Sequence, residues 1–155
     1  MSETTAADSG RIVVGVDGSQ PSLAALRRAA RIAELIGGSV EAVTTWEYPV
    51  MTDAFAVTTG WSPEEDAEEI LKRALAEAFD GAVPPYVRAA TAMGQPARVL
   101  TERSEGAHLL VLGSRGHGGF AGLLLGSVST ACAGHAKCPV LILHGTEDEN
   151  ARPEV

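Results

Sequence analysis

The stretch GSRGHGGFAGLLLGS spans Gly113–Ser127 and joins two segments of different character. It follows the apolar run Leu109–Leu112 and precedes a helix-like segment that begins near Ser127. Its six glycines allow close approach of the backbone to a ligand, because no Cβ stands in the way. Free N–H groups and the positive end of a helix dipole then suit a phosphate. The alternative is a flexible linker, but linkers of this composition join polar stretches rather than buried elements.

Length and composition indicate one domain with a small-aliphatic core. The 155 residues are 45% hydrophobic and only 5% aromatic. The net charge of −8, from 20 acidic and 12 basic residues, argues against a nucleic-acid groove. No apolar run approaches the ~20 residues of a membrane span. The first ten residues resemble no signal peptide, so we expect a cytoplasmic protein without a membrane partner.

Apolar runs alternate with helical patterns in the first half of the chain. The runs Arg11–Asp17 and Ser39–Trp46 predict buried strands. Between them, Ser19 is a plausible N-cap and Pro21 fits a first helical turn. The predicted helix extends to about Ile36 and carries one apolar face. That face consists of Leu23, Leu26, Ala30, Ala33 and Ile36.

The same alternation continues in the second half, after a loop over Tyr48–Trp61 without periodicity. Ser62-Pro63-Glu64-Glu65 is a capping box that opens a helix. The apolar face of that helix consists of Ala67, Ile70, Leu71, Ala74 and Ala78. Further strands are expected over Pro84–Thr91, His108–Gly113 and Val140–His144, and further helices from Gln95 to near Gly106 and from Ser127 to His135.

This order predicts an α/β fold, a single doubly wound parallel sheet with helices on both faces. Ligands of such sheets bind beyond the carboxyl ends of the strands, at the switch point. Asp17 ends the first strand and Gly113 the fourth. If these strands are central neighbours, both residues face one crevice.

The common catalytic phosphate and nucleophile motifs are missing from the sequence. It contains no GxxxxGK[ST], no GxGxxG after the first strand and no GxSxG. His117 lies in a GHGG segment, which is not the HxGH of nucleotidyl transferases. The other histidines lack ligand spacing, so we expect no histidine metal site and assign no catalytic residue. Cys132 and Cys138 are read as small buried hydrophobic residues.

The spacing of Gly113, Gly116, Gly126 and Ser127 resembles the universal stress protein family, specifically its ATP-binding branch. The opening VGVDGS and the closing CPVLIL share this resemblance, which covers nearly all of residues 11–144. It implies a five-stranded sheet of the adenine-nucleotide alpha hydrolase-like type, ordered 3-2-1-4-5. The universal stress protein domain would then span residues 11–145. The small, polar composition of residues 1–10 predicts a disordered N-terminus, and residues 146–155 are read as an acidic tail.

The resemblance further implies an adenine-nucleotide site. Asp17 would contact the ribose or adenine side, Thr45 would lie against adenine through its backbone, and Leu112 would line the nucleoside. A threonine replaces the usual aliphatic residue at position 45, which leaves its side-chain packing open. The full set is Asp17, Thr45, Leu112, Gly113, Gly116, Gly126, Ser127, Val128 and Ser129, of which Gly116 and the residues from Gly126 onward would hold the phosphates.

Several of these residues have a structural alternative. The hydroxyls of Ser127 and Ser129 either cap a helix or bind phosphate, and Asp17 either contacts ligand or caps the helix that follows. Arg115 either neutralises phosphate or is simply solvated.

The implied function is that of a nucleotide-binding stress-response regulator or signalling switch. The ligand that the resemblance implies would be ATP with magnesium, or AMP or cyclic AMP. The alternatives are a slow ATPase or phosphotransferase that uses Asp17, with weak hydrolysis or autophosphorylation at most, and a protein-interaction module without nucleotide. The apolar segment Val140–Leu143 would form a sheet edge, which predicts a homodimer through this strand.

Overall fold

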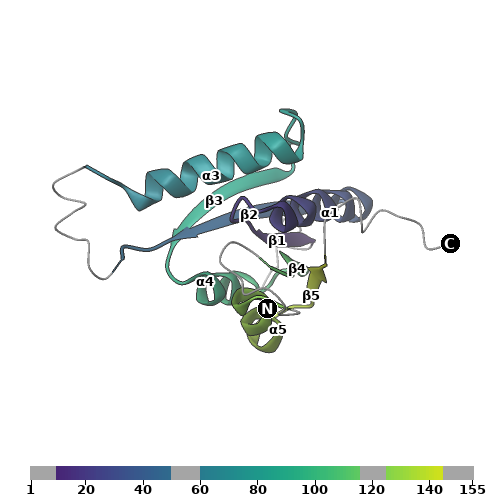
Figure 1. The fold of residues 1–155 in the computed structure, drawn as a ribbon. Coiled ribbons are helices and arrows are strands. Elements are labelled where there is room, and N and C mark those ends of the chain that lie inside the picture. Colours follow the sequence, from purple (N-terminus) through teal and green to yellow (C-terminus); the bar gives the residue numbers. More distant parts are fainter. Residues whose placement is uncertain (1–9, 50–59, 116–124, 145–155) are drawn as a thin grey trace, which may run out of the picture.

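The computed structural model describes residues 10–49, 60–115 and 125–144, which build one five-stranded sheet. Its order is β3-β2-β1-β4-β5 with every neighbouring pair parallel, which confirms the expected topology (Figure 1). β1 and β4 lie at the centre and are almost wholly apolar, as strands buried on both faces are. The strands are β1 (Arg11–Gly15), β2 (Ser39–Trp46), β3 (Val87–Met93), β4 (Leu109–Gly113) and β5 (Val140–Leu143).

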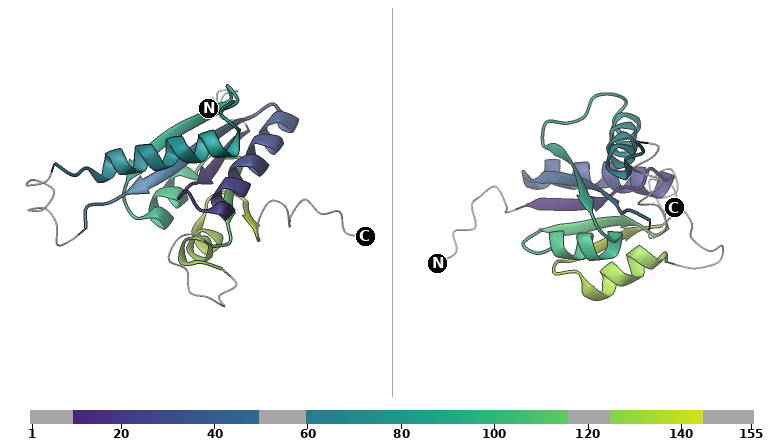
Figure 2. Two further views of the ribbon diagram at one scale, coloured as in Figure 1. Left: turned by 45° about the horizontal axis from the view of Figure 1, so that its top comes forward. Right: turned by 90° about the vertical axis from the view of Figure 1, so that its left-hand side faces the viewer.

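Helices cover both faces of this sheet (Figure 2). α1 (Gln20–Ile36) and α3 (Pro63–Ala78) pack on one face, and α4 (Pro96–Arg103) and α5 (Ser127–His135) pack on the other. Each face therefore has its own hydrophobic core, and β1 contributes to both because its side chains alternate. No described helix combines the length and the hydrophobicity that a membrane span requires.

The predicted helix starts are confirmed. The Ser19 side chain accepts a hydrogen bond from the Ser22 N–H at the start of α1, and Ser62 accepts one from Glu65 at the start of α3. Both helices have proline in the first turn. Gly37 ends α1 with φ of 68°, a left-handed conformation that glycine adopts without strain.

Some boundaries and burial assignments differ from expectation. The helical periodicity predicts that Ile36 and Ile70 are buried, but 44% of Ile36 and 40% of Ile70 is exposed. Ile36 is the last residue of α1, and Ile70 lies beside a face made by Ala67, Leu71, Ala74 and Ala78, which are all buried. β3 begins at Val87 rather than Pro84, and α4 ends at Arg103 rather than near Gly106.

Other predictions concern residues outside the described ranges. These are the disorder of the first residues, the acidic tail, most of the loop over 48–61, and the segment with Gly116 and His117. The domain boundaries drawn from the sequence stay predictions.

The two cysteines differ in their surroundings. Cys132 is fully buried in the core beneath α4 and α5, whereas Cys138 is half-buried, so the expectation of two buried cysteines holds for Cys132 only. Both are free thiols. Burial raises the pKa of each thiol above its usual value, which favours the protonated form.

Ser104 joins α4 to the segment between α5 and β5. Its side chain is fully buried, its hydroxyl donates to the Thr101 carbonyl (2.6 Å), and its Oγ accepts from the Lys137 N–H (2.7 Å). We expect Ser104→Ala to lower the free energy of unfolding by about 2 kcal/mol, because the Lys137 N–H loses its acceptor. Urea denaturation measures this change. Thr130→Ala removes an exposed hydroxyl that bonds the Gly126 carbonyl and should change stability by under about 0.5 kcal/mol. Equal effects of the two substitutions would contradict the argument.

Candidate functional site

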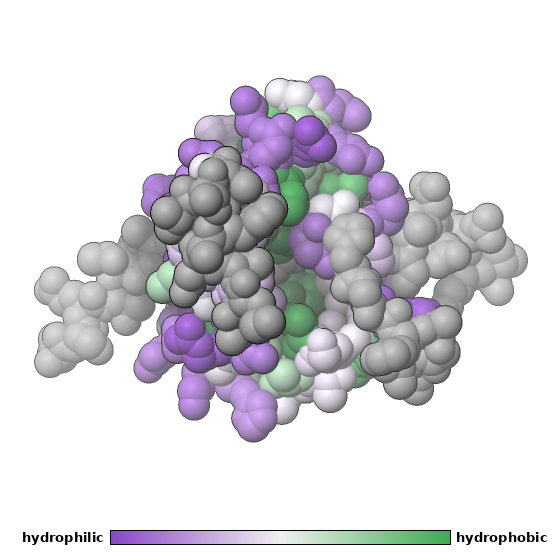
Figure 3. Space-filling view, turned by 60° about the vertical axis from the view of Figure 1, so that its left-hand side comes forward, coloured by the Kyte–Doolittle hydropathy of each residue, from purple (hydrophilic) through white to green (hydrophobic). Residues whose placement is uncertain are grey.

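A cavity of about 340 Å³ opens at the carboxyl ends of β1, β2 and β4. The chain leaves β1 toward α1 on one face and β4 toward α5 on the other, so this is the switch point of the sheet. In the space-filling view, hydrophobic residues lie within the hollow and hydrophilic residues lie around it (Figure 3). Asp17 and Gly113 both line this cavity, as expected for the ends of neighbouring central strands.

Two hydrogen bonds hold the start of α5 against the end of β4. The Gly126 N–H donates to the Ser114 carbonyl (2.6 Å), so the two ends of the glycine-rich loop lie together. The Ser129 hydroxyl donates to the Gly113 carbonyl (2.6 Å), and only 3% of Ser129 is exposed. Neither Ser127 nor Ser129 caps the helix, since Gly126 is the N-cap and no side chain bonds there. The capping alternative for these serines is therefore wrong.

The first turn of α5 opens into the cavity. Ser127, Val128 and Ser129 all line it, and Ser127 is exposed. The first N–H groups of a helix have no intrahelical acceptor. Within the described ranges, no acceptor is present for the N–H groups of these three residues, whereas Thr130 donates to Gly126. This helix start has the backbone groups and the dipole that bind an anion.

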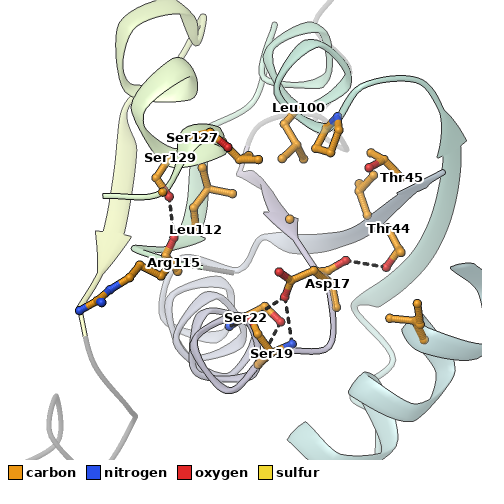
Figure 4. A pocket seen from close by; sticks show the side chains of 18 residues that line it. Asp17, Ser19, Ser22, Thr44, Thr45, Leu100, Leu112, Arg115, Ser127 and Ser129 are labelled. Atoms are coloured by element: carbon orange, nitrogen blue, oxygen red, sulfur yellow. Dashed lines mark hydrogen bonds between the residues drawn. The ribbon is translucent and has the colours of Figure 1, made fainter. Parts of the chain in front are cut away.

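Asp17 lies at the start of the other helix, α1, where Ser19 holds its carboxylate. Its Oδ1 accepts from the Ser19 N–H (2.9 Å) and from the Ser19 hydroxyl (2.5 Å) (Figure 4). Ser19, not Asp17, is the N-cap of α1. The carboxylate lies among the residues that line the cavity.

The remaining walls are mainly apolar and come from several elements. Thr44 and Thr45 lie at the end of β2, and the buried Thr44 hydroxyl donates to the Val16 carbonyl (2.8 Å). Thr45 lines the cavity as well. The apolar lining includes Val43, Ile70, Pro96, Leu100 and Leu112.

Gly113 is required for packing as well as for space in the cavity. A Cβ at this position would lie 2.6 Å from the Pro21 Cβ and 2.9 Å from its carbonyl carbon. The end of β4 therefore approaches the first turn of α1 more closely than any other residue type allows. The sequence pattern had indicated only a close approach to a ligand.

Charged groups are few in this cavity. Asp17 supplies a carboxylate, and Arg115 is an exposed arginine whose guanidinium extends away from Ser127 and Asp17 (Figure 4). Of the two alternatives for Arg115, its orientation favours solvation. Among the described residues, no group of histidine, cysteine, aspartate and glutamate side chains could hold a metal ion.

The structure brings together all the expected site residues that it describes, while Gly116 lies outside the described ranges. Their roles toward a ligand stay predictions. Sequence reasoning missed Ile70, Pro96 and Leu100, because apolar residues on helices look like core. It also assigned Ser19 only to helix capping, although the DGS turn could have suggested its bond to Asp17.

Comparisons with known proteins agree with this architecture. The pattern of the Universal stress protein family matches residues 9–144. A universal stress protein of Mycobacterium tuberculosis is 34% identical over 132 residues, which are 84% of this chain and 44% of that protein. The chain spans less than half of the length of the curated relatives it matches.

Solved structures show the same fold. The universal stress protein UspA from Lactobacillus plantarum has a TM-score of 0.72 at 19% identity, over 86% of this chain and 97% of that one. A universal stress protein in complex with cAMP has a TM-score of 0.65 at 29% identity, over 87% of this chain and 97% of that one. The sheet order and flanking helices are those of the adenine-nucleotide alpha hydrolase-like fold. The chain belongs to the universal stress protein family.

Proposed function

We propose that this chain binds an adenine nucleotide in the cavity, as a member of the ATP-binding branch of its family. The observation that carries the proposal is the start of α5, which has no side-chain cap and whose first three residues line the cavity. Phosphate oxygens are the natural acceptors for such groups. The similar structure with bound cAMP, at 29% identity, supports an adenine nucleotide as the ligand.

The two helix starts in the cavity give the nucleotide a direction. The start of α1 already has a side-chain cap from Ser19 and the negative charge of Asp17 beside it. The start of α5 has neither. A phosphate would be repelled at α1 and attracted at α5, so the phosphates lie against Ser127–Ser129.

The adenine end then lies toward the end of β2. The apolar side chains of Ile70, Leu100 and Leu112 suit the faces of a purine, and the Thr45 backbone offers hydrogen bonds to its edge. Among described residues the cavity has one carboxylate and no metal cluster, so magnesium would enter with ATP. With so few groups for chemistry, we propose a regulatory or switching role in the stress response, with at most weak hydrolysis.

Calorimetric titration of the purified protein tests this function. We expect AMP, ATP with magnesium, or cyclic AMP to bind with micromolar affinity, and adenosine to bind more weakly, because adenosine lacks the phosphate that α5 would hold. Protein is first checked for co-purified nucleotide. If none of the three nucleotides binds, the proposed function is wrong.

We also propose a homodimer through the edge of β5. This strand is wholly apolar, and among the described residues only β4 pairs with it. The carbonyls of Pro139 and Leu143 point to β4, so by alternation the backbone groups of Ile142 point outward. A second copy of β5 would satisfy them by antiparallel pairing.

Ile142→Pro should convert the dimer to a monomer at about 10 μM, because it removes an outward N–H that the pairing needs. Sedimentation velocity measures the change. Ala89→Pro is the matched control, since β3 is the opposite edge and its Tyr86 carbonyl faces β2, which makes Ala89 outward-facing too. That variant should remain dimeric. A monomeric wild-type protein would refute the dimer.

A further inference from the structure

The outer edge of β3 is exposed and is bordered by arginine side chains. We propose that this edge is a docking site for an acidic segment of another protein, which binds as an additional strand beside β3 (Figure 1). β3 and β5 form the two opposite edges of the sheet, so this site is separate from the proposed dimer contact. The inference does not depend on nucleotide binding.

The backbone of β3 is available for pairing on its outer side. Among the described residues only β2 pairs with this strand. At one end the Tyr86 carbonyl accepts from β2 (2.9 Å), and at the other the Gly94 N–H donates to β2 (2.9 Å). Because strand residues alternate in direction, the backbone groups of Ala89 and Thr91 point away from β2. An added strand would bond these N–H and C=O groups.

β3 also lacks the features that usually protect an edge strand. Its seven residues, Val87–Met93, are all described, contain no proline and include one charged residue, Arg88. The register with β2 is continuous, so no bulge turns the edge away. Ala89 is exposed, and 62% of Met93 is exposed. The other alanines of β3, at positions 90 and 92, are small and leave room for larger side chains on a neighbouring strand.

Arg88 gives this edge a positive charge near the start of the strand. Its side chain is exposed, and its partner in the register with β2 is Glu41. The Glu41 carboxylate is held by Arg103 of α4 (2.7 Å) and lies 4.0 Å from Arg11. Among the described residues, Arg88 has no carboxylate within ion-pair distance. A carboxylate from a partner would therefore meet a charge that this part of the chain does not neutralise.

Arg98 of α4 gives a second positive charge at the other end of β3. A Cβ added to Gly94 would collide with the Arg98 guanidinium, so this group lies against the residue that follows the strand. Its ion pair with Glu102 is exposed and joins residues one turn apart, and such pairs are weak. Arg88 and Gly94 are six positions apart, which is about 20 Å along a strand.

These positions define the partner. An extended segment advances by the same distance per residue, so two acidic residues six positions apart would meet Arg88 and Arg98 on the α4 face of the sheet. A second copy of β3 fits less well. If two copies paired antiparallel along the whole strand, the Arg88 end of one would lie opposite the Arg98 end of the other, and like charges repel.

The test titrates ¹⁵N-labelled protein with the peptide ETVTVTE, blocked at both termini, and follows the amide signals by NMR. We expect shifts concentrated in β3, above all at the N–H groups of Ala89 and Thr91. The peptide KTVTVTK has the same alternation with the opposite charge. It should bind at least about 10-fold more weakly, because two attractions are replaced by two repulsions.

Three variants separate strand pairing from charge. Ala89→Pro should weaken binding of ETVTVTE at least about 10-fold, because it removes an outward N–H, and an edge strand tolerates proline at such a position. Thr91→Pro tests the next outward position if Ala89→Pro does not fold. Arg88→Gln should weaken binding by about 3-fold, the size of an exposed ion pair. Arg31→Gln is the matched control, because it removes an exposed arginine of α1, on the other face of the sheet.

Several results would overturn the proposal. It is wrong if millimolar ETVTVTE shifts no amide of β3, if the two peptides bind equally, or if a folded proline variant binds as the wild-type protein does. Sedimentation velocity tests the remaining occupant. If Ala89→Pro lowers the oligomeric state of the protein, a second copy pairs with this edge and the acidic segment does not.

Discussion

Ser127→Asp is expected to bind AMP about 100-fold more weakly than the wild-type protein while being slightly more stable. An aspartate in the first turn of α5 puts a negative charge where we propose the phosphate to lie. Two like unit charges 4 Å apart near a protein surface repel by about 4 kcal/mol. The side chain at position 127 is exposed, and its mobility lowers this repulsion. The same charge interacts favourably with the helix dipole, which adds about 0.5 kcal/mol to the stability of the free protein.

The opposite signs of these two effects make the experiment decisive, because a variant that is merely damaged would lose both affinity and stability. Titration calorimetry measures the first effect and thermal unfolding the second. The asparagine of Ser127→Asn has nearly the same shape as the aspartate but no charge. This variant therefore shows the effect of losing the Ser127 hydroxyl alone. If the Asp and Asn variants bind AMP equally well, the phosphate does not lie at the start of α5.

Gly113→Ala is expected to lower the free energy of unfolding by about 3 kcal/mol, the upper end of the usual cost of overpacking. The added Cβ would lie 2.6 Å from the Pro21 Cβ and 2.9 Å from the Pro21 carbonyl carbon. The backbone of Pro21 belongs to the first turn of α1 and cannot rotate away as a side chain could. The end of β4 must therefore move, and it takes with it the carbonyl that accepts from Ser129.

Nucleotide affinity should fall together with stability in this variant, because the start of α5 is held through that same carbonyl. Urea denaturation and AMP titration measure the two losses. Gly134→Ala is the matched control, since an added Cβ there, in the last turn of α5, would have no atom of another part of the described structure within 4 Å. It should be neutral, or stabilising by up to about 1 kcal/mol. A Gly113→Ala variant as stable as this control would show that the packing argument is wrong.

Most of the fold could be predicted from the sequence, because helix caps, turn residues and apolar runs are signals carried by residues that are close together in the chain. The serine caps, the prolines of the first turns and the left-handed Gly37 specify where α1 and α3 begin and where α1 ends. Near-continuous apolar strands separated by helices leave few arrangements other than a doubly wound parallel sheet. Boundaries were less certain where signals were weak, as at the start of β3 and the end of α4.

Ile70 shows where the local pattern misleads. Its spacing matches the apolar face of α3, but the face that β2 and β3 cover is narrower than the apolar stripe. The residue at the margin is left half-exposed, and it lines the cavity. Periodicity gives the direction of a helix face, whereas the width of the buried part depends on what packs against it.

The sequence by itself determined the class of fold, the order of its elements and the glycine–serine spacing that indicates a phosphate site. Only the tertiary structure decided which groups remain available in that site. It bonds the Ser129 hydroxyl to the Gly113 carbonyl and turns Arg115 away. It also places Pro21 against Gly113. Helix and strand signals arise between residues close in the chain. The contacts of Gly113 with Ser129 and Pro21 join β4 to α5 and α1, and they depend on how the whole sheet packs.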